Sequence, residues 1–199
     1  MPDALFIYLA SRSPRRAELL RQIGVRFTVV EAADAPAEVR DPAETAADYV
    51  LRIGRAKASA GLATVRAQGL PLRPVLGADT EVIVDGEVLG KPADAAQAAQ
   101  FLRRLAGRWH EVRSAVALAT ASGVAGAVSV SAVRFAHLSD ERIERYCATG
   151  EPCDKAGGYG IQGLAAVFIE ELQGSYSGVM GLPLAETAQL LEAAGVRVL

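Results

Sequence analysis

Residues 75–84 read Val-Leu-Gly-Ala-Asp-Thr-Glu-Val-Ile-Val, and Asp85-Gly86 follows them. A mostly apolar run of this length predicts a buried strand, which we place over residues 74–84. Asp-Gly after such a run is the strongest hairpin signal in the chain, so a short strand is expected to return over residues 87–89. The middle of the chain is therefore predicted to be β-structure with a carboxylate, Asp79, inside it.

Helices and strands alternate upstream of this hairpin. Strands are predicted at residues 4–10 and 27–30, and the helix between them starts at Ser13-Pro14 and stops at Gly24. A long helix is expected to follow and to run to about residue 68. Its predicted start is Asp41-Pro42-Ala43-Glu44, which has the order of an N-cap, a first-turn proline and a capping-box acid.

The same alternation continues downstream. We predict a helix from about Asp94, a hairpin, a helix capped at Ser139, a strand, a last helix and a short tail strand. The hairpin strands are placed at residues 109–121 and 124–136, the later strand at 164–169 and the last helix at 184–194. Alternation without repeats or an evident linker predicts an α/β fold in one domain, residues 1–199, with room for two lobes.

Composition narrows the class further. The chain has 199 residues, of which 51% are hydrophobic and 22% charged, so a sizeable core can be buried. A net charge of −2 argues against nucleic acid as a partner. Two cysteines and two histidines are too few for a disulfide framework or a zinc site. No apolar run is long enough to span a bilayer or to act as a signal, so we expect a cytoplasmic protein without a membrane partner.

Residues 154–163 form a glycine-rich loop that also carries Lys155 and Gln162. Such a composition suits backbone wrapped around a small polar ligand. The stretch from Gly158 to Gly163 matches the dinucleotide fingerprint, which requires a preceding buried strand and a following helix. The residues before it are polar and turn-like, and those after it are predicted as strand. A nicotinamide or flavin site is therefore disfavoured.

Three arginines follow Ser11 at the start of the first predicted helix: Arg12, Arg15 and Arg16. The helix macrodipole disfavours cations at this end, and a bound phosphate would offset that cost. The Ser11 hydroxyl, free backbone amides and two guanidinium groups would together form an anion site. The alternative is a solvated basic turn.

Two lysines and one aspartate are further candidates. Lys57 lies near the inner face of its helix, where it needs an anionic partner or must extend to solvent. Lys91 lies between Gly90 and Pro92 in a rigid connection, although a plain loop lysine is the simpler interpretation. Asp79 is costly to bury unpaired. It could form an ion pair or bond backbone amides, and it could equally bind a divalent ion or accept a proton from water.

Taken together, these residues resemble the Maf-like nucleoside triphosphate pyrophosphatases over nearly the whole chain. The matching pieces are Leu9 to Arg16, Lys57-Ala58, Gly77 to Thr80, Gly90-Lys91-Pro92, Thr149 to Pro152, Asp154 to Gly163, and Gly181 to Leu184. The resemblance implies a two-lobed mixed-sheet α/β fold with flanking helices and a central cleft. It also implies a homodimer in many members, although the sequence shows no interface signature.

Members of this family split nucleoside triphosphates between the α and β phosphates with a divalent metal, Mg or Mn. The resemblance makes Asp79 the proton acceptor. The arrangement of charges assigns the phosphates to Ser11, Arg16, Lys57, Lys91 and Lys155. The resemblance places the metal on Asp79 and on a second acid, Asp34, with Glu38 as the alternative because residues 31–38 do not align securely.

The glycine-rich loop resembles the branch that prefers dTTP and UTP. Positions matching Arg15, Thr80 and Gln162 are those linked to selectivity. The Gln162 amide offers one acceptor and two donors, which suit the N3 hydrogen and a carbonyl of uracil or thymine. Two alternatives stay open: a modified pyrimidine nucleotide as the physiological substrate, and a nucleotide-binding regulator of cell division with little turnover.

Overall fold

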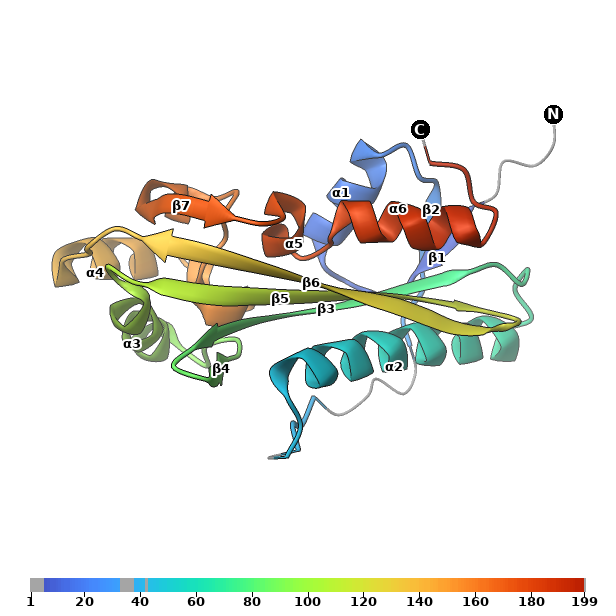
Figure 1. The fold of residues 1–199 in the computed structure, drawn as a ribbon, viewed down its shortest axis with the longest axis horizontal. Coiled ribbons are helices and arrows are strands. Elements are labelled where there is room, and N and C mark those ends of the chain that lie inside the picture. The colour runs from blue at the N-terminus through green and yellow to red at the C-terminus, as the bar shows by residue number, and fades with distance from the viewer. Residues whose placement is uncertain (1–5, 33–37, 42, 199) are drawn as a thin grey trace. The chain divides into compact units, whose positions relative to one another are not determined.

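The computed structural model describes residues 6–32, 38–41 and 43–198. It confirms the α/β class, with a mixed seven-stranded sheet and flanking helices (Figure 1). The strand order is β2 (Phe27–Val29), β1 (Ile7–Leu9), β3 (Val75–Val84), β5 (Trp109–Thr120), β6 (Gly123–Phe135) and β7 (Ile169–Gln173), with β4 (Glu87–Leu89) paired to β3. The predicted hairpins are confirmed, and Asp85 and Gly86 both take positive φ, at 53° and 76°, as a type I′ turn requires.

The chain divides into two compact units. The first takes the described residues of Met1–Asp79, Ser114–Ser129 and Gly181–Leu199, and the second takes Thr80–Arg113 and Val130–Met180. Three of the boundaries fall within β3, β5 and β6, so each of these strands contributes to both units, and the fourth follows Met180.

The first unit is built on parallel strands. β1 pairs in parallel with β2 and with β3, and the helices α1 (Pro14–Gln22) and α2 (Ala46–Ala67) connect them in the order of the sequence. Figure 1 shows α2 on one side of these strands, with α1 and α6 (Leu184–Ala193) on the other. Its buried cluster comprises Tyr8, Ala10, Val30, Ala58, Leu62, Val65, Val75, Ala117 and Ala119.

Close packing of α2 on β3 depends on two glycines. A Cβ at Gly77 would lie 2.4 Å from the backbone nitrogen of Ala58, and one at Gly61 would lie 2.8 Å from side-chain carbons of Ala10 and Val75. Neither distance leaves room for a side chain, because real Cβ contacts are longer. The backbones of helix and strand therefore approach directly.

The predicted start of α2 is wrong. Its N-cap is Thr45, whose hydroxyl oxygen accepts a hydrogen bond from the Asp48 amide at 3.1 Å. Asp41 instead forms a separate turn, in which its carboxylate accepts from the Ala43 amide at 2.8 Å. Both threonine and aspartate are good N-caps, so local sequence could not choose between them. The predicted end is confirmed, with Gln68 as the C-cap.

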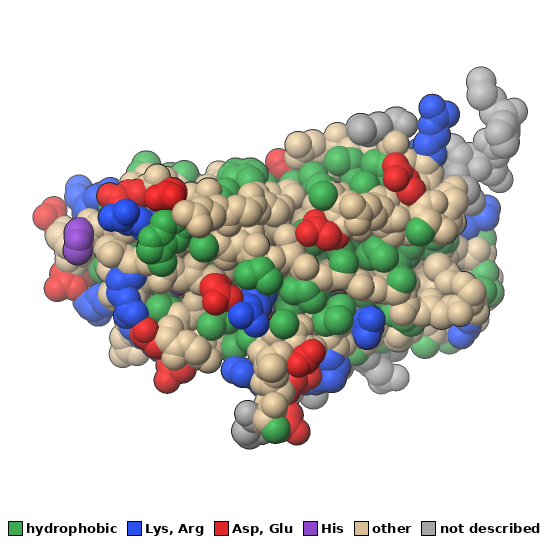
Figure 2. All heavy atoms as spheres, viewed as in Figure 1, with side chains coloured by type: hydrophobic (Ala, Val, Ile, Leu, Met, Phe, Trp, Pro, Cys, Tyr) green, Lys and Arg blue, Asp and Glu red, His purple; other side chains and the backbone are tan. Residues whose placement is uncertain are grey.

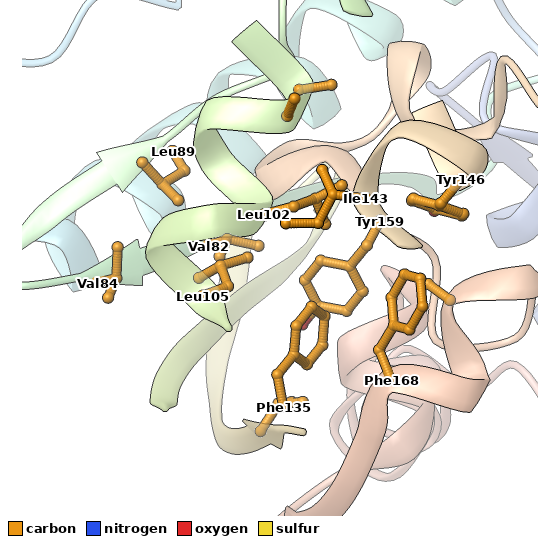
Figure 3. Close-up of a cluster of buried hydrophobic side chains, with 14 of the residues drawn as sticks. Val82, Val84, Leu89, Leu102, Leu105, Phe135, Ile143, Tyr146, Tyr159 and Phe168 are labelled. Carbon is orange, nitrogen blue, oxygen red and sulfur yellow. The ribbon is translucent and has the colours of Figure 1, made fainter. Parts of the chain in front are cut away.

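The second unit has an aromatic core. The helices α3 (Ala95–Leu105) and α4 (Asp140–Ala148) pack together. The predicted helix start at about Asp94 and the predicted cap at Ser139 are confirmed. Figure 3 shows Phe135, Tyr159 and Phe168 gathered beside Leu102 and Ile143. The rings of Phe135 and Tyr159 lie edge to face with centroids 4.8 Å apart.

Two late predictions are wrong. Leu164–Phe168 is a 3-10 helix, η3, and the strand β7 begins only at Ile169. An apolar run this short does not separate a strand from a buried turn. Residues 196–198 form no strand, and α5 (Tyr176–Met180) precedes α6.

The surface carries charged side chains of both signs. On the face shown in Figure 2, acidic and basic side chains are intermixed. Ion pairs among the described residues include Arg104 with Glu87 at 2.8 Å and Arg103 with Asp140 at 2.6 Å. None of the helices in the described part of the chain has the length and apolar character needed to cross a membrane.

Burial of His110 makes stability depend on pH. Its Nε2 lies 2.7 Å from the Tyr159 hydroxyl oxygen, and burial lowers the pKa of the imidazole from 6.5 to about 4. Between these two values the unfolded chain binds a proton that the folded protein does not. Stability is therefore lost as pH falls below 6.5.

We predict that lowering the pH from 7 to 5 costs about 2 kcal/mol through His110 alone. Urea unfolding at both pH values should show a smaller loss for His110→Gln than for the wild type. His137→Gln, which removes an exposed histidine, is the matched control. Equal losses in the wild type and His110→Gln would contradict the prediction.

Candidate functional site

The first unit fixes Ser11 and Arg16 at the start of α1. The Arg16 Nη1 donates to the Ser11 hydroxyl at 3.1 Å, and its Nε donates to the Gly181 carbonyl at 2.8 Å. The Ser13 amide donates to the same hydroxyl at 3.2 Å, and Pro14 opens the helix. Two of the matching motifs, 165 residues apart, thus meet through one guanidinium group.

Lys57 and Asp79 form the second contact in this unit. The Lys57 Nζ lies 2.7 Å from the Asp79 Oδ1, and only 19% of the lysine side chain is exposed. Of the two alternatives for Lys57, the structure shows the anionic partner. The side chain does not extend to solvent. The pairing follows from the packing, since Gly77 lies against the backbone beside Lys57 and Asp79 comes two residues later on β3.

Glu38 joins this pair. Its Oε1 lies 2.7 Å from the Lys57 Nζ, so one ammonium contacts two carboxylates. Asp34, the other acid considered from sequence, lies outside the described residues. The sequence could not choose between the two acids, because the segment 31–38 gave no secure alignment.

The second oxygen of Asp79 has no such contact. Its side chain is 8% exposed, yet Oδ2 is buried without a hydrogen-bond partner among the described residues. A buried carboxylate oxygen in that state loses its hydration without compensation. It is therefore an acceptor ready for a proton, a water or a cation.

The second unit contains Lys155 and Gln162. The Lys155 Nζ donates to the Glu151 carbonyl at 2.6 Å and also pairs with Asp154. A Cβ at Gly160 would lie 2.9 Å from the Lys155 Cε and 3.4 Å from the Gln162 Nε2, so both side chains pass over this glycine. Gln162 itself is exposed.

Three predicted site residues remain: Lys91, Thr80 and Arg15. Lys91 is exposed directly after Gly90, whose carbonyl accepts from the Gly157 amide at 3.0 Å and so ties this connection to the glycine-rich loop. Thr80 is half-buried on β3, and Arg15 is half-buried in the first turn of α1.

The glycine-rich loop lacks the context of a dinucleotide site. The 3-10 helices η1 (Glu151–Asp154) and η2 (Ala156–Gly158) precede the fingerprint, and η3 follows it. Neither the strand nor the helix that holds a pyrophosphate is present at this loop.

Sequence reasoning missed one residue, Glu151. It lies within the motif from Thr149 to Pro152, and its carboxylate accepts hydrogen bonds from the Tyr146 hydroxyl and the Leu164 amide, each at 2.9 Å. The available signal was a glutamate at the head of a glycine-rich loop, which does not reveal a partner 13 residues away.

Comparison with known proteins finds similarity over nearly the full length of the chain. A family model described as Maf-like protein matches residues 6–194. A protein of Aromatoleum aromaticum named dTTP/UTP pyrophosphatase is 53% identical over 95% of both chains. Proteins of the same name from Burkholderia pseudomallei and Ralstonia nicotianae are each 55% identical, over 98% and 96% of this chain and 96% and 94% of their own.

Among solved structures, the Staphylococcus aureus Ham1 protein covers 94% of this chain and 96% of its own at 14% identity. Its TM-score of 0.48 is too low to support a conclusion. The family model and the close relatives do not depend on it. With 189 consecutive positions spanned by the model and half of all residues shared with those relatives, the chain belongs to the Maf-like family.

Proposed function

We propose that this protein hydrolyses dTTP and UTP to the monophosphate and pyrophosphate. The observation that carries the proposal is the buried Asp79, with one oxygen bound to Lys57 and the other available. It occurs in a chain whose relatives at 53–55% identity are named dTTP/UTP pyrophosphatase.

Asp79 is the proposed proton acceptor. Its hydrogen bond from the Lys57 ammonium fixes the orientation of the carboxyl group and leaves Oδ2 as its free acceptor. The buried Oδ2 then accepts the proton of the attacking water. Water adds in line at the α-phosphorus, the bond to the bridging oxygen breaks, and pyrophosphate leaves.

Cationic side chains are proposed to neutralise the triphosphate. Arg16 is held rigidly by Ser11 and Gly181, so little side-chain entropy is lost when a phosphate binds. Lys57, Lys91 and Lys155 are the other proposed phosphate ligands. Charged donors of this kind stabilise the charge that spreads over the phosphate oxygens during transfer.

A divalent cation, Mg or Mn, fits the acids of the first unit. Asp79 and Glu38 would hold it, which suits Mg²⁺ because this ion is usually bound by one or two carboxylates plus substrate phosphates. No group of three acid, histidine or cysteine side chains among the described residues could hold a metal alone, so the substrate would supply ligands. The ion would withdraw charge from the phosphate oxygens.

Base selectivity is assigned to the glycine-rich loop. The exposed Gln162 amide can pair with the N3 hydrogen and a carbonyl of uracil or thymine, whereas cytosine has no hydrogen at N3. Arg15 and Thr80 are proposed as further selectivity residues. A cytoplasmic location and a homodimer stay predictions from the sequence.

The direct test is a substrate panel. Purified protein is incubated with dTTP, UTP, CTP, ATP and GTP, with Mg²⁺ or Mn²⁺, and the products are separated. Monophosphate and pyrophosphate in equal amounts are expected, with dTTP and UTP preferred. Release of orthophosphate alone, or tight binding without turnover, would refute the proposal, and the second result would favour a nucleotide-binding regulator.

Asp79→Asn should lower kcat for dTTP by about 10²- to 10⁴-fold, because the amide cannot accept the water proton. The fold should persist, since an amide fits the same space and Glu38 still contacts Lys57. Pyrophosphate release measures the effect, and the melting temperature checks the fold. Asp85→Asn makes the same change at the end of the same strand and should leave kcat unchanged.

Glu38→Gln should raise the Mg²⁺ concentration for half-maximal activity at least about tenfold, because a proposed metal ligand loses its charge. Asp34→Asn is measured alongside it, and Glu31→Gln, at an exposed position nearby, is the control. A shift in Asp34→Asn with none in Glu38→Gln would transfer the role to Asp34.

A further inference from the structure

Glu151 closes the glycine-rich loop with its side chain. Its Oε2 accepts from the Leu164 amide at 2.9 Å, and its Oε1 accepts from the Tyr146 hydroxyl at 2.9 Å and from the Ala165 amide at 3.4 Å. Residue 151 begins η1, and residues 164 and 165 begin η3. One carboxylate thus holds the two ends of the segment 152–163 together.

The loop is shaped to admit this carboxylate. A Cβ at Gly163 would lie 2.4 Å from the Glu151 Oε1 and 2.6 Å from its Oε2. The φ of Gly163 is −101°, so its backbone conformation does not call for glycine. The glycine is needed for space, because any side chain there would displace the carboxylate.

The hydroxyl donor is itself fixed. Tyr146 lies on α4 and is buried in the aromatic core, where its ring meets Phe168 edge to face at 5.2 Å. Burial and the neighbouring Glu151 carboxylate raise the pKa of the Tyr146 hydroxyl, so it stays a donor at neutral pH. The carboxylate is therefore anchored to the core.

The closed segment contains Lys155 and Gln162. The Glu151 carbonyl accepts from the Lys155 Nζ, so this residue contacts the loop through its backbone as well as its side chain. Gln162 directly precedes Gly163, whose backbone lies against the carboxylate. The position of the Gln162 amide thus depends on the hydrogen bonds that Glu151 accepts two and three residues later, at Leu164 and Ala165.

We propose that Glu151 is a positioning residue for base selection. By binding the amides of residues 164 and 165, it sets where the Gln162 amide lies and so how strongly uracil and thymine are preferred over cytosine. The inference rests on the proposed function. Glu151 acts through the loop and contacts neither the reacting phosphorus nor the water.

Glu151→Ala removes all three hydrogen bonds and tests this role. We expect kcat/KM for UTP to fall by about tenfold to a hundredfold, because small misplacements of binding groups have effects of this size. The preference for UTP over CTP, as a ratio of kcat/KM values, should fall by about fivefold, the equivalent of one hydrogen bond. Loss of stability alone would lower both activities equally and leave the ratio unchanged.

Two further variants show how the UTP-to-CTP preference depends on the contacts of Glu151. Tyr146→Phe removes one donor and leaves both amide bonds, so the ratio should stay closer to the wild-type value than in Glu151→Ala. Glu144→Ala removes an exposed glutamate from the same helix and should change nothing. A folded Glu151→Ala with the wild-type ratio would overturn the proposal.

Amide hydrogen exchange supplies a readout that does not need activity. Peptides covering residues 157–165 should exchange faster in Glu151→Ala and in the milder Glu151→Gln, while α2 keeps its wild-type rates. Unchanged exchange in the loop would also overturn the inference. A wild-type protein that releases no pyrophosphate would refute the proposed function instead, and the exchange rates would still decide whether Glu151 holds the loop.

Discussion

The direct approach of α2 to β3 is the constraint on which the candidate site of the first unit depends. With no side chain at Gly77, the helix backbone reaches the strand, and Lys57 is carried to Asp79. A buried carboxylate without this cation would be costly, whereas Lys57 also contacts Glu38. The close packing of α2 on β3 therefore places the Lys57 ammonium beside the Asp79 carboxylate. The catalytic chemistry that we propose uses this ion pair.

In the second unit, the glycine-rich loop must be held in one conformation. A loop rich in glycine has high conformational entropy when unfolded, so its ordered form needs compensating contacts. Here they are of two kinds: Tyr159 lies within the aromatic core, and Glu151 closes the ends of the loop. The loop can then present polar groups while its backbone stays fixed, as ligand recognition requires.

Much of this was predictable from sequence, and the failures have physical causes. Local rules predict the buried strand with Asp79, the turn at Asp85-Gly86, the helix start at about Asp94 and the cap at Ser139, and all four are confirmed. The start of α2 failed because two good N-caps competed. The segment at 164–168 failed because periodicity is ambiguous in so short a run. The contacts of Glu151 and Glu38 were out of reach, since each depends on where distant parts of the chain meet.

The unsatisfied oxygen of Asp79 has a consequence for engineering this protein. Selection for thermal robustness alone would favour neighbouring substitutions that give this oxygen a hydrogen-bond donor, because a partner would remove its desolvation penalty and keep the ion pair with Lys57. A change that satisfies this oxygen would thus raise the melting temperature and remove the acceptor that we propose for the water proton. A thermostabilised descendant should be screened for turnover at every round, since one such gain in melting temperature lies where the chemistry is proposed to occur.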